Sequence, residues 1–157
     1  MKLLISKELS TDNIDEMLEV LKSELDTEII FFDTSLSKEF ADTGAIRVDY
    51  EDRKSVPSLA LQEAVARDCQ ASLFIPKSCE PKSGLIDELF QPLSDDHNIM
   101  ATHSDYSLDG TNIIQNRPLV LCRRLEPNIE NLYDLQQTKG IVKYIPLSLY
   151  NVSIQEN

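Results

Sequence analysis

Two short groups of polar residues stand where an apolar run ends, which is where ligand-binding residues gather in open α/β sheets. Asp33, Thr34 and Ser35 directly follow the run EIIFF, and Lys77 and Ser78 follow the run ASLFIP. An ammonium group in such a loop can contact a phosphate as a point charge, although a solvated lysine is the commoner case. Asp33 suits a turn cap equally well, because Asp, Thr and Ser side chains form local hydrogen bonds with the backbone. We expect any ligand to bind near these two groups.

A third group offers acid–base chemistry. His103 and Asp105 are two residues apart, and residues at this spacing on a strand point to the same face. A carboxylate in that position can orient an imidazole and raise its basicity. Residues at this spacing are neighbours on any strand, whether or not they have a function. A surface histidine is therefore the commoner explanation for His103. His97 lies beside Asp95 and Asp96 in a spacing that matches no known metal motif, and a solvated loop is expected there.

The sequence lacks the motifs of several classes of enzyme. There is no G-x-S-x-G element, no P-loop and no G-x-G-x-x-G, and the four glycines are far apart. This counts against ATPases, kinases and dinucleotide-binding enzymes. A phosphoacceptor receiver domain would use an aspartate such as Asp33 and a lysine such as Lys77, but it also needs an acidic pair after the first strand. That strand is followed here by Lys7 and Glu8.

The composition indicates one soluble domain. The chain has 157 residues and a net charge of −12, with 27 acidic against 15 basic side chains. Such a balance argues against a nucleic-acid surface, which needs basic residues to displace counterions. Three scattered cysteines fit free thiols in a reducing compartment. No secretory signal or membrane-spanning run is evident, so we expect a cytoplasmic protein.

Periodicity predicts alternating strands and helices. Strands are predicted at 2–6, 28–32, 45–50, 71–75, 99–103 and 118–123. Helices are predicted at 14–25, at 55–65 with an entrance at residues 55–57, and at 85–93, the third capped by Ser83 and ended by Pro92. A weaker helix is predicted at 129–137. The apolar tail, residues 141–152, fits a strand, a short helix or both. The order predicts an α/β fold, a three-layer α/β/α sandwich with a mixed, mostly parallel sheet.

Residues 2–106 resemble the nucleotide-binding half of family-2 glycosyltransferases, which have the GT-A fold. In that family the second strand ends in an acidic signature that reaches the donor nucleoside, and Asp33 matches its first acid. The strand before the family's metal-binding D-x-D resembles ASLFI, but Pro76 and Ser78 occupy the two aspartate positions. The segment from His103 to Tyr106 resembles a family strand that ends in S-D-Y.

The resemblance implies a single domain, 1–157, made of a nucleotide-binding-like half (1–106) and a hairpin, helix and apolar tail (107–157). It implies a truncated, degenerate glycosyltransferase-like domain that binds a nucleotide or nucleotide sugar with weak or no transferase activity. Its nucleotide-binding residues would be Asp33, Thr34, Ser35, Lys77, Ser78 and Asp105, and the hypothesis requires Asp33, Ser78 and Asp105 to converge on one cleft.

No cofactor is predicted. Mg²⁺ and Mn²⁺ require hard oxygen ligands, which Pro76 lacks and the neutral hydroxyl of Ser78 supplies poorly. The alternative function is a non-catalytic scaffold or protein-interaction domain. In that case residues 141–152 would provide a contact for a homo-oligomer or another partner.

Overall fold

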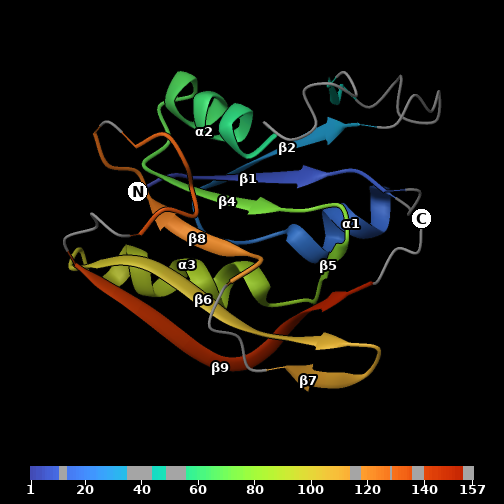
Figure 1. The fold of residues 1–157 in the computed structure, drawn as a ribbon. Helices are drawn as coiled ribbons and strands as arrows, with labels where there is room; N and C mark the ends of the chain where they lie inside the picture. The colour runs from blue at the N-terminus through green and yellow to red at the C-terminus, as the bar shows by residue number, and fades with distance from the viewer. Residues whose placement is uncertain are drawn as a thin grey trace.

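The chain folds into one mixed sheet with helices on both faces (Figure 1). In a computed structural model, the described residues are 1–10, 14–34, 44–48, 56–113, 118–127, 129–135 and 140–153. The elements within these ranges are β1 (Leu3–Glu8), α1 (Ile14–Leu21), β2 (Thr27–Asp33), β3 (Ile46–Arg47), α2 (Val56–Ala66), β4 (Ala71–Ile75), β5 (Cys79–Pro81), α3 (Leu85–Asp95), β6 (Ile99–Leu108), β7 (Thr111–Ile113), β8 (Leu121–Arg124) and β9 (Ile141–Val152).

The strand order of the sheet is β3-β2-β1-β4-β8-β6-β9-β5, with β7 paired to β6. Strands β3, β2, β1 and β4 are parallel, so their carboxyl ends meet at one edge. Strand β8 runs antiparallel between β4 and β6, and β9 is parallel to β6. The prediction of a mixed sheet is confirmed. The described pairings divide equally between parallel and antiparallel, however, because the second half of the chain adds antiparallel neighbours.

Two apolar clusters hold the helices against the sheet. Helices α1 and α3 pack on one face, with Met17, Leu89 and Phe90 among the buried side chains. Helix α2 packs on the other face through Val56 and Ala60. Beyond these helices the sheet curls along the long strands β6 and β9, so that it has the shape of a half-barrel (Figure 1). The α/β class is confirmed, while a complete three-layer sandwich remains an expectation.

The central strand 71–75 has the predicted bounds, and all five side chains of β4 are buried. Strand β1 is also buried on both faces, but it continues past the predicted end at Ser6 to Glu8. The charged residues Lys7 and Glu8 were not expected inside the sheet. Strand β3 is described only at Ile46–Arg47, and the end of the predicted strand 45–50 lies outside the described residues.

Helix predictions were correct in place but wrong in detail. Gly84, and not Ser83, precedes α3, with a φ of 93° that favours glycine and no side-chain cap. Pro92 lies inside α3 instead of ending it, and the helix continues to Asp95 because the Pro92 carbonyl still accepts a hydrogen bond from Asp96 N–H. The apolar residue Val65, at the end of the predicted helix, is 63% exposed. No described helix is long and apolar enough to cross a membrane.

The second half of the chain contains more strand than predicted. Strand β6 extends from Ile99 to Leu108 and turns into β7 at Asp109 and Gly110, whose φ angles of 49° and 83° fit a tight hairpin turn. The weak helix predicted at 129–137 is wrong for residues 129–135, which are irregular apart from a turn at Leu132 and Tyr133, and the remainder lies outside the described residues. The apolar tail is strand β9, which buries Ile145, Leu149 and Tyr150 in the core.

Candidate functional site

The carboxyl edge of the parallel strands brings two of the predicted groups to the same side of the sheet. Phe32 pairs with Glu8, and Ile75 pairs with Lys7, so β2 and β4 end on either side of the end of β1. Asp33 and Thr34 therefore lie two strands from the loop that contains Lys77 and Ser78. Ser35 lies outside the described residues.

The end of β2 is buried. Asp33 is 3% exposed, and its backbone carbonyl accepts a hydrogen bond from Val48 N–H at 3.0 Å. The Thr34 hydroxyl oxygen is buried and has no hydrogen-bond partner in the described part of the chain. A buried hydroxyl without a partner costs free energy. This oxygen is thus a polar group that a bound molecule can satisfy.

The loop after β4 is held firmly. The Cys79 N–H donates to the Pro76 carbonyl at 3.1 Å, which closes a tight turn over Lys77 and Ser78. The Ser78 carbonyl accepts from Ser153 N–H at 2.9 Å, which ties the loop to the end of β9. Both predicted side chains in the turn are half-buried. The turn therefore presents Lys77 and Ser78 on a fixed backbone.

Lys7 is the residue of this edge that sequence reasoning missed. Its side chain is fully buried, and its Nζ donates to the Glu8 carbonyl at 2.8 Å and to the Pro76 carbonyl at 3.3 Å. The ammonium thus connects the ends of β1 and β4 beneath the turn. The apolar run predicts a strand end at Ser6, so the sequence does not place Lys7 inside the strand. The available signal is its spacing of four and two residues from Leu3 and Ile5, which share its face.

The loop does not fit a divalent metal. Pro76 supplies only its carbonyl oxygen, which already accepts hydrogen bonds from the Lys7 ammonium and from Cys79 N–H. A positive charge in contact with that oxygen opposes binding of a second cation. Burial raises the pKa of the Cys79 thiol to about 11, so it stays protonated and is a poor ligand. Within the described ranges, no three His, Cys, Asp or Glu side chains gather as a metal site.

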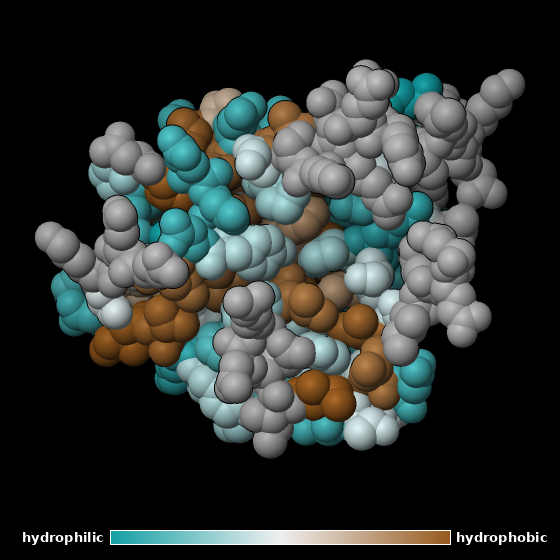
Figure 2. Space-filling model, viewed as in Figure 1, coloured by the Kyte–Doolittle hydropathy of each residue, from teal (hydrophilic) through white to brown (hydrophobic). Residues whose placement is uncertain are grey.

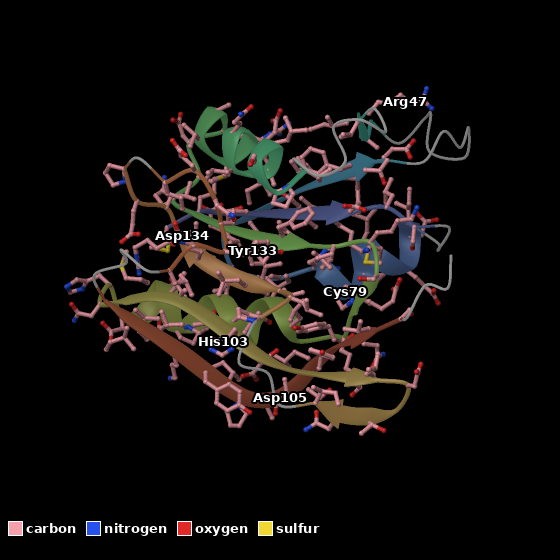
Figure 3. All side chains as sticks on the ribbon, in the orientation of Figure 1. Arg47, Cys79, His103, Asp105, Tyr133 and Asp134 are labelled. Carbon is pink, nitrogen blue, oxygen red and sulfur yellow. The ribbon has the colours of Figure 1, made fainter. Side chains whose placement is uncertain are left out.

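Asp105 lies in a different part of the sheet. Its strand, β6, is four positions from β2 in the strand order, which is about 19 Å along the sheet at the usual strand spacing. The Tyr144 hydroxyl donates to Asp105 Oδ1 at 2.5 Å, and the rings of Tyr144 and His103 are 5.5 Å apart. Figure 3 shows His103 and Asp105 together on β6, far from Arg47, which pairs with Asp33. Asp105 thus belongs to a cluster with His103 and Tyr144.

The surface grooves that the structure defines lie elsewhere. One groove, of about 620 Å³, lies between α3 and β9 and is lined by Glu88, Asp95 and Lys143, among others. Two more are lined by residues of α1 with β2 and by residues of α2. None of these three contains a predicted site residue. His97, the other histidine, is exposed in the turn before β6.

Comparison with known proteins identifies the fold. No protein-family model matches the sequence. No curated protein matches it either. Among solved structures, the chain is similar to glucosyl-3-phosphoglycerate synthase from Mycobacterium tuberculosis in complex with Mn²⁺, uridine diphosphate and glucosyl-3-phosphoglycerate, with 15% identity and a TM-score of 0.66 over 99% of this chain and 73% of that one. The complex of that enzyme with phosphoglyceric acid gives 15% identity and a TM-score of 0.64 over the same shares.

A further structure of the same synthase, with Mg²⁺ and uridine diphosphate, gives 13% identity and a TM-score of 0.60 over 99% of this chain and 72% of that one. These similarities cover nearly the whole chain, so they support a GT-A-like fold. At such low identity they show the fold alone. The predicted resemblance to glycosyltransferases is confirmed at this level.

Proposed function

We propose that this chain binds a nucleotide or nucleotide sugar at the carboxyl edge of β2, β1 and β4, without a divalent metal and with weak or no transferase activity. The observation that carries the proposal is the buried Thr34 hydroxyl, which has no partner among the described residues and lies beside Asp33 at the edge where ligands bind in α/β sheets. The structural neighbours are complexes with uridine diphosphate, which supports this ligand class.

Each side chain has a role in the proposal. Asp33 and Thr34 hydrogen-bond the nucleoside, and Lys77 places a positive charge near the phosphates. Ser78 donates its hydroxyl to the same group. The Lys7 ammonium holds the turn in place through the Pro76 carbonyl. Its positive charge takes the part of the family's metal ion, which would neutralise the charge of the phosphates. In this proposal the chain is a degenerate member of a three-layer GT-A-like group. Asp33, Ser78 and Asp105 do not converge as the sequence hypothesis required, so the proposed site is narrower and leaves Asp105 out.

Isothermal titration with uridine diphosphate and uridine-diphosphate glucose, with and without Mn²⁺, tests the proposal. We expect binding that Mn²⁺ does not strengthen. Thr34→Val keeps the shape of the side chain and removes only the hydroxyl, so we expect about a tenfold loss of affinity, equivalent to about 1.4 kcal/mol. Asp33→Ala is expected to weaken binding at least as much.

Asp15→Ala, on the exposed side of α1, is the matched control and leaves affinity unchanged. No heat and no thermal shift with either ligand would exclude the binding proposal. A strong dependence on Mn²⁺ would contradict the role assigned to Lys7 and the metal-free loop.

The second candidate function is a non-catalytic interaction domain. Besides Tyr144, strand β9 carries exposed aliphatic side chains, among them Ile141 at 54%, Val142 at 38% and Leu147 at 45%. Figure 2 shows hydrophobic surface at the left end of the molecule, where β9 begins. An exposed apolar strand of this kind is suited to a protein contact.

Light scattering of the full chain tests this second function. If residues 141–152 form an oligomer contact, the protein is a dimer or larger, and the double change Ile141→Ser and Leu147→Ser yields a folded monomer. Truncation after Gly140 is not informative, because it removes Ile145, Leu149 and Tyr150 from the core. Val65→Ser, at an equally exposed apolar residue of α2, serves as the control. A monomeric full chain at all concentrations would exclude the oligomer.

A further inference from the structure

Three chemically complementary side chains meet on the open face of β6 and β9, away from the nucleotide edge. His103 pairs directly with Tyr144 in the register of the two strands, and Asp105 lies two residues further along β6. The His103 and Tyr144 rings are 5.5 Å apart and tilted by 47°. The two labelled residues of β6 lie close together along the strand in Figure 3. Residues from two distant parts of the chain thus form one cluster.

The carboxylate in this cluster has unused capacity to accept hydrogen bonds. Asp105 is 4% exposed, and its side chain accepts one hydrogen bond, from the Tyr144 hydroxyl at 2.5 Å. A carboxylate has about four acceptor positions, and burial makes unfilled ones costly. In the described parts of the chain, no Lys or Arg forms an ion pair with it. A single hydrogen bond from the Tyr144 hydroxyl offsets only a small part of the free-energy cost of burying a carboxylate.

The imidazole is a second acceptor. The His103 Nδ1 atom is buried and has no hydrogen-bond partner within the described ranges. Burial lowers the pKa of His103, and the nearby Asp105 only partly opposes that effect. The ring is therefore neutral at neutral pH, so one of its two nitrogens can accept a hydrogen bond. The side chain as a whole is half-buried, which leaves part of the ring open to solvent.

Tyr144 gives the cluster an apolar wall. Its side chain is 39% exposed although its hydroxyl is held by Asp105. Fixing the hydroxyl orients the ring, so one ring face is presented to solvent beside two hydrogen-bond acceptors. A ring in this orientation can pack against C–H groups while neighbouring acceptors bind hydroxyls.

We propose that His103, Asp105 and Tyr144 form a second ligand site, which binds a hydroxyl group of a neutral sugar or polyol. The two acceptors suit a hydroxyl donor, and the aromatic wall suits the C–H face that sugars carry. An anion is disfavoured because Asp105 would repel it. A hydroxyl bound here donates to Asp105 or to His103, and a neighbouring hydroxyl of the same sugar donates to the other.

This site is separate from the nucleotide edge. Strand β8 lies between β4 and β6, so the loop with Lys77 and Ser78 is about 10 Å from β6 along the sheet. The register places Phe74 and His103 on either side of Leu121, which puts Asp105 level with Pro76. Sugar binding at the cluster does not require the proposed nucleotide function. The two are tested with different ligands.

The protein's two histidines supply the experiment. His103 reports on the cluster, and the exposed His97 is an internal reference. NMR follows the imidazole signals of the full chain during titration with glucose, galactose or glycerol to about 100 mM. At that concentration, binding with a dissociation constant above about 1 mM is still detectable. We expect saturating shifts of the His103 signals with at least one sugar, while the His97 signals stay in place.

Matched variants separate binding from structure. Asp105→Asn keeps the shape and can still accept from Tyr144, so we expect a folded protein whose sugar affinity falls about tenfold. Asp109→Asn, in the exposed turn of the same hairpin, leaves the affinity unchanged. Equal or non-saturating shifts of both histidines would overturn the proposal. Saturation by tetramethylammonium but by no sugar would also overturn it and assign the cluster to a cation.

Discussion

Replacing Lys7 with alanine is expected to lower the free energy of unfolding by about 3–5 kcal/mol. The side chain is fully buried, so its removal leaves a cavity in the sheet. Its Nζ donates to the carbonyls of Glu8 and Pro76, which then lose a charged donor. Hydrogen bonds to charged groups contribute about 1.5–3 kcal/mol. Urea unfolding followed by circular dichroism measures the change.

Two further lysine changes separate the contributions. Lys7→Met retains most of the buried volume and removes only the donor, so we expect a smaller loss, of about 1–3 kcal/mol. Lys2→Ala, in the same segment, removes a lysine whose ion pair with Glu28 is at the surface, 3.0 Å long and one-third exposed. That change is expected to have a much smaller effect on the free energy of unfolding, because exposed ion pairs contribute little to stability. A Lys7→Ala protein as stable as Lys2→Ala would show that the buried ammonium does not support the edge.

The Lys7 result also bears on function. Because its ammonium holds the Pro76 carbonyl, it fixes the turn that presents Lys77 and Ser78. If the nucleotide site depends on that turn, Lys7→Met weakens uridine-diphosphate binding even when the protein stays folded.

Local patterns predicted the first half of the fold and missed contacts between distant residues. The run 71–75 is buried on both faces, so its apolar sequence specified the strand without help from its neighbours. The partner of Asp105 was not predictable from the sequence, because Tyr144 lies 39 residues away. It also belongs to a segment that fitted a strand, a short helix or both. Lys7 was misassigned for the same reason. Its hydrogen bond to Pro76 spans 69 residues, and this tertiary contact makes burial of its charge possible.

The segment 129–135 shows how a tertiary contact replaces a weak local preference. Its apolar residues at helical spacing predicted a helix, but the Arg123 guanidinium takes the backbone carbonyls that a helix would use. Arg123 Nη1 donates to the carbonyls of Asn131 and Leu132, both at 3.1 Å, and also to that of Asp134. Three carbonyls that converge on one guanidinium nitrogen hold the segment in a backbone that lacks the helical hydrogen bonds to amides four residues later, and the Asn131 carbonyl accepts instead from Asp134 N–H, three residues on. Arg123 thus determines the conformation of the segment.

Replacing Arg123 with alanine is therefore expected to cost about 3–5 kcal/mol and to release residues 129–135 from the sheet. Only 4% of the side chain is exposed, and its Nη2 also donates to Glu126 Oε2 at 3.1 Å. The freed segment takes Leu132, which is 3% exposed, out of the core against α2. Amide hydrogen exchange measures the release, with faster exchange expected at 129–135 than in β4.

Conservative and surface changes make this prediction specific. Arg123→Lys keeps the charge but lacks the planar fork that reaches the carbonyls and Glu126 together, so we expect it to recover less than half of the lost stability. Arg67→Ala, which removes ion pairs to Glu63 and Glu28 at a residue 36% exposed, is expected to cost no more than about 1 kcal/mol. If Arg123→Ala left the exchange of 129–135 unchanged, the segment would be held by packing of Leu132 alone. Because Arg123 also lies on β8, between β4 and β6, its loss is expected to loosen the strand that separates the nucleotide edge from the His103 cluster.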